Sequence, residues 1–256
     1  MTFELVEDDN LSRAWARAVR PMLGRRAVKE VAPICISIVG FEQGEVVEED
    51  AIRTTLDTAL KAAGKQDCHA VANTIFPEAY WNPSKPRSLL FERFARSLPR
   101  IKDSSTKNKR GTYFERMISG GPKLHPNQLD FVLNVYAKRP SVRRSALQVG
   151  VFNPQLDQTG AAQQGFPCLQ HVTFAPVKDQ LNVNAFYATQ YAFERAYGNY
   201  LGLCRLGRFV AHELKLELAR VTCYTGILLR DGLKPQGLQG LAKVIDANVG
   251  AKGSGE

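Results

Sequence analysis

Three consecutive segments decide the fold of this 256-residue chain: SVRRSALQVGVFNP (141–154), FPCLQHVTFAPV (166–177) and LNVNAFYATQYAFERAYGN (181–199). Their β-branched and aromatic residues predict three strands, at about 144–152, 169–176 and 181–188. A helix then follows over about 190–214, and we expect it to be largely buried because apolar residues occupy most of its circumference. The rest of the chain is expected to fold around this unit.

The remaining elements follow from apolar spacing and from proline and glycine signals. Further strands are predicted over 32–40 and 217–229. Helices are predicted over 10–20, 48–63, 88–97 (closed by Pro99) and 127–139, with a short helix in the tail and a frayed end over 248–256. The polar stretch 100–112 is predicted to be a loop, either a solvated connector or a nucleotide-facing segment. No repeat or long linker is present, so we expect one α+β domain over 1–256.

Composition narrows the class of protein. The net charge of +9 favours an anionic partner such as a nucleotide, nucleic acid or membrane surface, although scattered basic residues also fit a solvated surface. The five cysteines are irregularly spaced, which argues against a disulfide framework or zinc ribbon, and the four histidines form no metal-binding pattern. No apolar run approaches the roughly 18 residues of a membrane helix, and the N-terminus has no signal core. We therefore expect a soluble, cytoplasmic protein.

Cys168 is the first candidate catalytic residue. It follows Pro167 at the start of a predicted strand, which fixes the position of its thiol. A nucleophilic cysteine needs its thiolate stabilised, usually by a nearby cation or a helix N-terminus. Arg143 and Arg144 begin the neighbouring predicted strand, which would allow them to lie at the same end of the sheet as Cys168. His171 lies three residues farther and should point to the opposite face, which argues against a Cys–His dyad. The alternative is that Cys168 is a packed small hydrophobic residue.

Together, the Arg143–Arg144 pair, the FPC step at Cys168, and Asn199 at its spacing from Cys168 resemble the thymidylate synthase family. The resemblance covers about 126–220, and RGTYFERM (110–117) is a faint echo of a further family segment. It implies a thymidylate synthase-like α+β fold, in which helices cover a bent mixed sheet and two chains form a homodimer through a sheet face.

The resemblance also implies roles for individual residues. Cys168 would be the nucleophile that adds to C6 of a pyrimidine nucleotide or related anionic substrate. Arg143 and Arg144 would bind its phosphate across the dimer interface, a role that suits bidentate guanidinium groups. Asn199 would bind the base, and 5,10-methylenetetrahydrofolate would donate the one-carbon unit.

Several family positions are changed in this chain. The segment that carries Gln-Arg-Ser-x-Asp in the family is Tyr187–Tyr191 here, which replaces a phosphate-binding arginine with Ala188 and makes Tyr187 and Tyr191 candidate substrate-binding residues. The family's sugar-binding segment aligns with 227–231, and its catalytic glutamate aligns with Thr58. The general base is therefore not placed; candidate carboxylates are Glu48, Glu49, Asp50, Asp57 and Glu78.

The leading hypothesis is a divergent transferase that moves a one-carbon unit, methyl or hydroxymethyl, to C5 of a pyrimidine. The alternative is a non-catalytic protein of the same fold that binds a nucleotide, nucleic acid or protein partner. Nucleic-acid binding would use the basic surface and would weaken steeply with salt.

Overall fold

The computed structural model describes residues 3–104, 108, 111–120, 126–158, 160 and 167–249. A seven-stranded mixed sheet has the order β1-β3-β9-β8-β7-β6, with β2 paired to β9; β1 and β3 are parallel, as are β8 and β9. The strands are β1 (Glu4–Asp8), β2 (Glu30–Val31), β3 (Ile34–Ile38), β6 (Gln148–Gly150), β7 (Leu169–Val177), β8 (Gln180–Tyr191) and β9 (Glu217–Leu229). A small hairpin joins β4 (Phe41–Glu42) and β5 (Glu45–Val46). The expected α+β class with a mixed sheet is confirmed.

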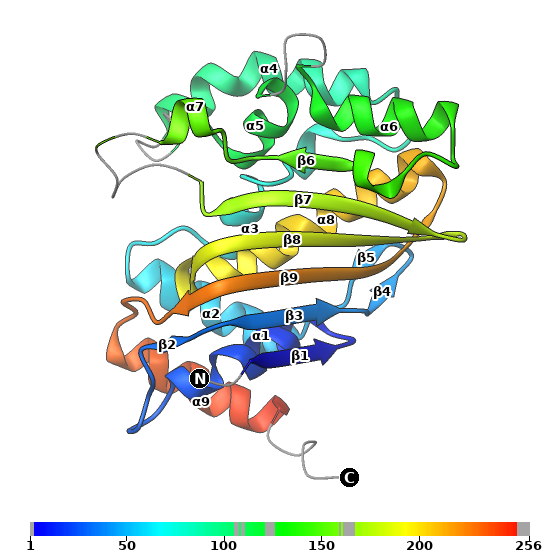
Figure 1. Ribbon diagram of the computed structural model, residues 1–256. Coiled ribbons are helices and arrows are strands. Elements are labelled where there is room, and N and C mark those ends of the chain that lie inside the picture. Colours follow the sequence, from blue (N-terminus) through cyan, green and yellow to red (C-terminus); the bar gives the residue numbers. More distant parts are fainter. Residues whose placement is uncertain are drawn as a thin grey trace.

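Helices cover one face of this sheet (Figure 1). The helices α1, α2, α3 and α8 lie behind the strands, and α4 to α7 gather beyond the β6 edge. The described helices are α1 (Leu11–Val19), α2 (Asp50–Ala62), α3 (Cys68–Ala72), α4 (Ser88–Asp103), α5 (Tyr113–Ser119), α6 (Gln128–Lys138), α7 (Pro154–Asp157), α8 (Tyr197–Leu214) and α9 (Pro235–Val249). None of them has the length and apolar character needed to cross a membrane. The opposite sheet face carries no helix of the described chain.

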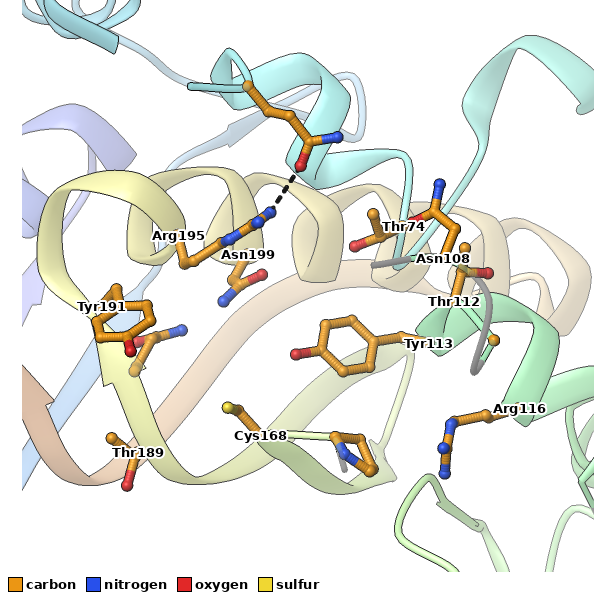
Figure 2. A pocket seen from close by; sticks show the side chains of 14 residues that line it. Thr74, Asn108, Thr112, Tyr113, Arg116, Cys168, Thr189, Tyr191, Arg195 and Asn199 are labelled. Atoms are coloured by element: carbon orange, nitrogen blue, oxygen red, sulfur yellow. Dashed lines mark hydrogen bonds between the residues drawn. The ribbon is translucent and has the colours of Figure 1, made fainter. Parts of the chain in front are cut away.

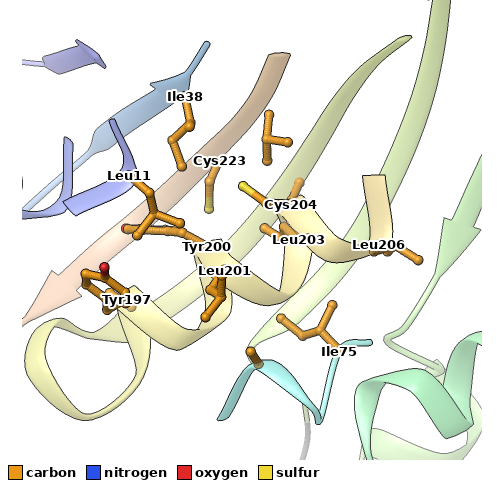
Figure 3. Packing of buried hydrophobic residues seen from close by; sticks show 14 of the residues in the cluster. Leu11, Ile38, Ile75, Tyr197, Tyr200, Leu201, Leu203, Cys204, Leu206 and Cys223 are labelled. Carbon is orange, nitrogen blue, oxygen red and sulfur yellow. The ribbon is translucent and has the colours of Figure 1, made fainter. Parts of the chain in front are cut away.

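Helix α8 is the centre of the core, as its apolar circumference predicts. Fourteen of its eighteen residues are buried, and the helix contacts β8, β9 and α3. Figure 3 shows Ile38 and Cys223 of the sheet on one side of α8 and Ile75 on the other. Because α8 is buried on both sides, its first turn has a fixed position relative to the start of β7 and the end of β8.

Two glycines let α3 approach the start of α8 closely. A Cβ atom on Gly198 would lie 2.5 Å from Val71 Cβ, and one on Gly202 would lie 2.8 Å from the Ala72 carbonyl oxygen. The neighbours are backbone and branched atoms that cannot move aside individually. We expect Gly202→Ala to lower the free energy of unfolding by about 1–3 kcal/mol in urea denaturation, although alanine favours helix.

Gly240→Ala is the matched control for this prediction. Gly240 lies in α9, and the nearest atom to an added Cβ is Thr55 Cγ2 at 3.8 Å, an ordinary contact. This variant should keep or slightly raise stability because alanine has the higher helix propensity. Equal stability of the Gly202→Ala and Gly240→Ala proteins would contradict close packing of α3 on α8.

Several predicted boundaries are wrong. The helix expected to close at Pro99 continues to Asp103, with Pro99 inside it, where proline removes a backbone hydrogen bond without ending the helix. The strand expected over 144–152 is only Gln148–Gly150, preceded by a 3-10 turn over Arg144–Ala146. Of the polar stretch 100–112, residues 100–103 belong to α4, and 105–107 and 109–110 lie outside the described residues. Of the expected frayed end, 248–249 close α9 and 250–256 lie outside the described residues.

The junction between β8 and α8 also differs from the prediction. The helix was expected from about residue 190, but β8 continues to Tyr191 because it stays paired with β9 up to the Tyr191–Leu229 pair. A π-helical turn over Ala192–Ala196 then leads into α8. Turns of this kind occur frequently at functional sites.

Candidate functional site

A pocket of about 220 Å³ opens at the N-terminal end of β7 (Figure 2). Segments far apart in sequence line it: Gln66 and Thr74, Asn108 with Gly111–Tyr113 and Arg116, Pro167 and Cys168, and five residues between Thr189 and Asn199 at the junction of β8 and α8. Cys168, Tyr191 and Asn199, all predicted from the sequence to be functional, therefore meet in one place. The RGTYFERM segment also contributes to the pocket, since its residues Gly111, Tyr113 and Arg116 line it.

Tyr187 lies next to this pocket and does not line it. The side chain is fully buried, and its hydroxyl has no hydrogen-bond partner among the described residues. Its ring meets the ring of Tyr113 edge to face, with centroids 6.4 Å apart. Tyr187 therefore packs against Tyr113 next to the pocket. Tyr191, the other candidate tyrosine, lines the pocket itself.

Arg143 and Arg144 lie away from the pocket of their own chain, so the expectation that they share an end of the sheet with Cys168 is wrong. Strand β6 is antiparallel to β7, with Gln148 opposite Thr173 and Gly150 opposite His171. The chain before β6 consequently lies beside the far end of β7. Arg144 lines a separate surface hollow there with Lys178, and both arginines are exposed without an ion pair among the described residues.

The surroundings of Cys168 oppose ionisation of its thiol. Desolvation raises the pKa of this thiol, and the nearby Arg195 guanidinium lowers it in part. Burial also raises the pKa of the Tyr113 phenol to about 12, and the effect of Cys168 acts in the same direction. At neutral pH both groups are therefore protonated, and Tyr113 is available as a neutral hydrogen-bonding group.

This environment predicts the pH dependence of Cys168 alkylation. Thiolate is the reactive form, so the rate with iodoacetamide should rise with pH and reach its midpoint above the ordinary thiol value of 9.0. Arg195→Gln removes the cation that lowers the pKa, so its midpoint should move further up. Arg96→Gln, an exposed change on α4, should leave it in place. Site-resolved mass spectrometry follows the reaction, and a midpoint below 9.0 would contradict desolvation of the thiol.

Arg195 is a pocket residue that the sequence analysis missed. It lies in the π-helical turn, whose first amides are fixed by Asp231: Phe193 N–H donates to Asp231 Oδ1 (2.8 Å) and Glu194 N–H to Asp231 Oδ2 (2.6 Å). Arg195 Nη1 donates to Gln66 Oε1 over 2.9 Å. The signal that could have found it is spacing, since Tyr191, Arg195 and Asn199 follow one another at intervals of four. Gln66, by contrast, comes from a distant loop and leaves no such signal.

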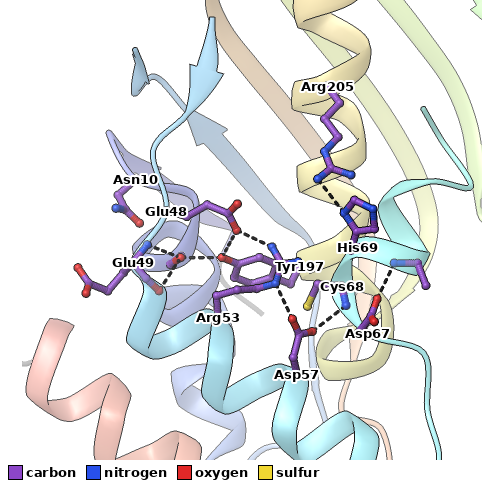
Figure 4. A network of polar contacts seen from close by, with 12 residues as sticks. Asn10, Glu48, Glu49, Arg53, Asp57, Asp67, Cys68, His69, Tyr197 and Arg205 are labelled. Carbon is purple, nitrogen blue, oxygen red and sulfur yellow. Dashed lines mark hydrogen bonds and ion pairs between the residues drawn. The ribbon is translucent and has the colours of Figure 1, made fainter. Parts of the chain in front are cut away.

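No carboxylate and no histidine is present among the described lining residues. The carboxylates considered as general bases are engaged elsewhere: Glu48 and Asp57 each pair with Arg53 at 2.8 Å, as Figure 4 shows. Glu78 pairs with Arg205 and Arg208. Glu49, Asp50 and Thr58 lie at the start and on the surface of α2, outside the pocket lining. His171, opposite Phe186 in the sheet, does not line the pocket either.

No family model matches the chain, and no curated protein matches it in sequence.

Among the described residues, no group of three His, Cys, Asp or Glu side chains could hold a metal ion. The pocket volume of about 220 Å³ is also small, since sites for drug-sized ligands start at about 300 Å³. The lining itself holds no feature specific to a folate, and 5,10-methylenetetrahydrofolate stays a prediction from the resemblance.

Proposed function

We propose that this chain is a divergent thymidylate synthase-like transferase that moves a one-carbon unit to C5 of a pyrimidine nucleotide or related anionic substrate. The observation that carries the proposal is the meeting of Cys168 and Asn199 in one small pocket (Figure 2). A primary amide both donates and accepts hydrogen bonds, so Asn199 complements the adjacent N–H and C=O groups of a pyrimidine edge. In this proposal the Cys168 thiol approaches a ring that Asn199 holds, since both residues line the same pocket.

The proposed chemistry starts at the Cys168 sulfur. Its thiolate adds to C6 of the ring, and the electron pair of the C5–C6 double bond moves toward C5 and the neighbouring carbonyl oxygen. C5 then attacks the carbon of a one-carbon electrophile carried on an amine, and the C5 proton passes to water. The bond from that carbon to the amine breaks with its electron pair going to nitrogen, and the carbon takes up a hydride from the reduced carrier (methyl) or hydroxide from water (hydroxymethyl). The sulfur then leaves C6 with its electron pair, which restores the C5–C6 double bond and the thiolate. Asn199 holds the ring during these steps, and Arg195 favours the thiolate.

A second candidate function has its own support. The absence of a carboxylate among the described lining residues, and the raised pKa of the Cys168 thiol, favour a protein that binds a pyrimidine nucleotide without transforming it. Such a protein would retain the pocket of Asn199, Arg195 and Tyr113 as a recognition site, with a nucleic acid or protein as a further partner.

Release of tritium from C5 separates the two functions. Uridylate, deoxyuridylate and their cytosine counterparts, each tritiated at C5, are incubated with the protein and methylenetetrahydrofolate. The transferase should release tritium to water from one of them and yield a product heavier by the transferred carbon. A nucleotide that binds in calorimetry without releasing tritium would contradict the transferase and support the binding protein.

We also propose that two chains pair through the sheet face that the helices leave bare. Leu5, Phe186 and Tyr224 are exposed large apolar residues of β1, β8 and β9, and the last two rings stack with centroids 5.5 Å apart. Exposed apolar surface of this kind marks an interaction site. A face-to-face dimer would also give Arg143 and Arg144 a partner's surface to contact. Light scattering should report a dimer for the native chain and a monomer for Phe186→Lys; a monomeric native chain would contradict the pairing.

A further inference from the structure

Arg195 places an uncompensated positive charge in the pocket. Among the described residues its guanidinium makes one hydrogen bond, to the neutral Gln66 amide, and no carboxylate of theirs lies within ion-pair distance of it. The adjacent Glu194 does not offset the charge, because its carboxylate pairs with Lys65 at 2.6 Å. The remaining guanidinium N–H groups are thus available to a ligand.

Two amide side chains that line the pocket with Arg195 also have hydrogen-bonding groups without a partner among the described residues. Asn199 is only 3% exposed, lines the pocket, and makes no side-chain hydrogen bond among the described residues. The Oε1 of Gln190 accepts from Tyr200 and Thr225, while its buried Nε2 has no partner. Buried polar groups are normally satisfied, so these amides indicate a place built for ligand atoms.

We propose that Arg195 is the anion-binding residue of this pocket and pairs with a compact oxyanion, a phosphate monoester or a carboxylate, on the same ligand whose ring contacts Asn199. The assignment deepens the proposed function and, for the ring, rests on it. Arg143 and Arg144 are too far from the pocket of their own chain to serve, whereas Arg195 and Asn199 follow at helical spacing and point into one space (Figure 2).

The hydrogen bonds that position Arg195 fit this anion-binding role. Asp231 fixes the turn through two backbone amides, and Gln66 holds one guanidinium nitrogen, so the free edge of the guanidinium is oriented before a ligand arrives. An arginine held in this way can form two parallel hydrogen bonds with an oxyanion. The charge also acts on the Cys168 thiol, which places the anion site next to the reactive atom.

Protection of Cys168 from iodoacetamide tests the assignment without requiring turnover. Inorganic phosphate and acetate are the first probes, and deoxyuridine with its 5′-monophosphate is the second pair, each at ionic strength matched with chloride. Protection is expressed as the ratio of alkylation rates without and with the probe, so that a change in thiol pKa cancels within each protein. The proteins are the native chain, Arg195→Gln, Arg195→Lys and Arg96→Gln, the last being an exposed arginine of α4.

In the native chain and in Arg96→Gln, phosphate or acetate should protect Cys168, and the better of the two names the oxyanion. Arg195→Gln should lower the affinity of that anion about 10-fold or more, and Arg195→Lys should restore part of it. No protection of the native chain, or equal protection of the Arg195→Gln protein, would overturn the assignment. If the anion protects through Arg195 but no pyrimidine nucleotide binds or reacts, the proposed function fails and the anion site stands.

Discussion

Cys168→Ser is expected to reduce tritium release from C5 by at least about 1,000-fold, because the step that activates C5 needs a nucleophile at C6. The serine hydroxyl has nearly the size of the thiol and is a far weaker nucleophile at neutral pH. The dissociation constant of the nucleotide, measured by calorimetry, should change by no more than about threefold, since Asn199 and Arg195 remain in place.

Cys35→Ser is the matched control for this substitution. Cys35 is partly exposed in β3, opposite Tyr224 in β9 and away from the pocket lining. Its replacement should leave both tritium release and nucleotide affinity at the native level. Native rates in the Cys168→Ser protein would contradict covalent catalysis, and loss of nucleotide binding in that protein would show that the thiol contributes mainly to the shape of the pocket.

The second large effect is expected at the wall of the pocket, where Arg116 pairs with Asp157. Arg116 Nη1 and Nη2 donate to the two carboxylate oxygens of Asp157 at 2.8 and 2.9 Å, and only 12% and 3% of the two side chains are exposed. Asp157 also accepts from the Asn153 N–H at 2.8 Å. Arg116→Met should lower the free energy of unfolding by about 3–5 kcal/mol in urea denaturation, because it removes the bidentate cationic partner of a buried carboxylate.

Two comparisons isolate that cause. Replacing both partners, as Arg116→Met with Asp157→Leu, should recover most of the loss because no buried charge remains. Arg20→Met removes an exposed pair, Arg20 with Asp246 at 3.1 Å, and should cost less than about 1 kcal/mol. If Arg116→Met lowered the free energy of unfolding no more than Arg20→Met does, the Arg116–Asp157 pair would not stabilise this part of the fold.

Local patterns predicted those elements whose apolar spacing agrees with their tertiary surroundings. The circumference of α8, the β7–β8 hairpin and the long strand β9 follow from residues that lie close in sequence. The junction near Tyr191 could not be predicted in the same way, because pairing with β9 keeps the chain extended there. Likewise, nothing local shows that α4 would continue past Pro99.

The residues of the candidate site likewise fall into those that local sequence predicts and those that depend on tertiary structure. Cys168, Tyr191 and Asn199 lie on one stretch whose spacing could be compared with a known pattern, and they meet in the pocket. The placement of Arg143 and Arg144 depends on the antiparallel register of β6, which spacing does not report. Gln66 comes from a loop more than 120 residues before Arg195 in the chain, and only the folded structure brings the two together.

Intact-mass spectrometry with 5-fluoropyrimidine nucleotides tests the central claim most directly. The native chain and Cys168→Ser are incubated with the ribo and deoxy forms of the uracil and cytosine compounds, with and without methylenetetrahydrofolate. A covalent adduct on the native chain that is absent from the Cys168→Ser protein is the predicted result, and the compound that forms it names the base and the sugar. Dependence on the folate would identify the donor. Folded protein that forms no adduct with any of these compounds would contradict the transferase.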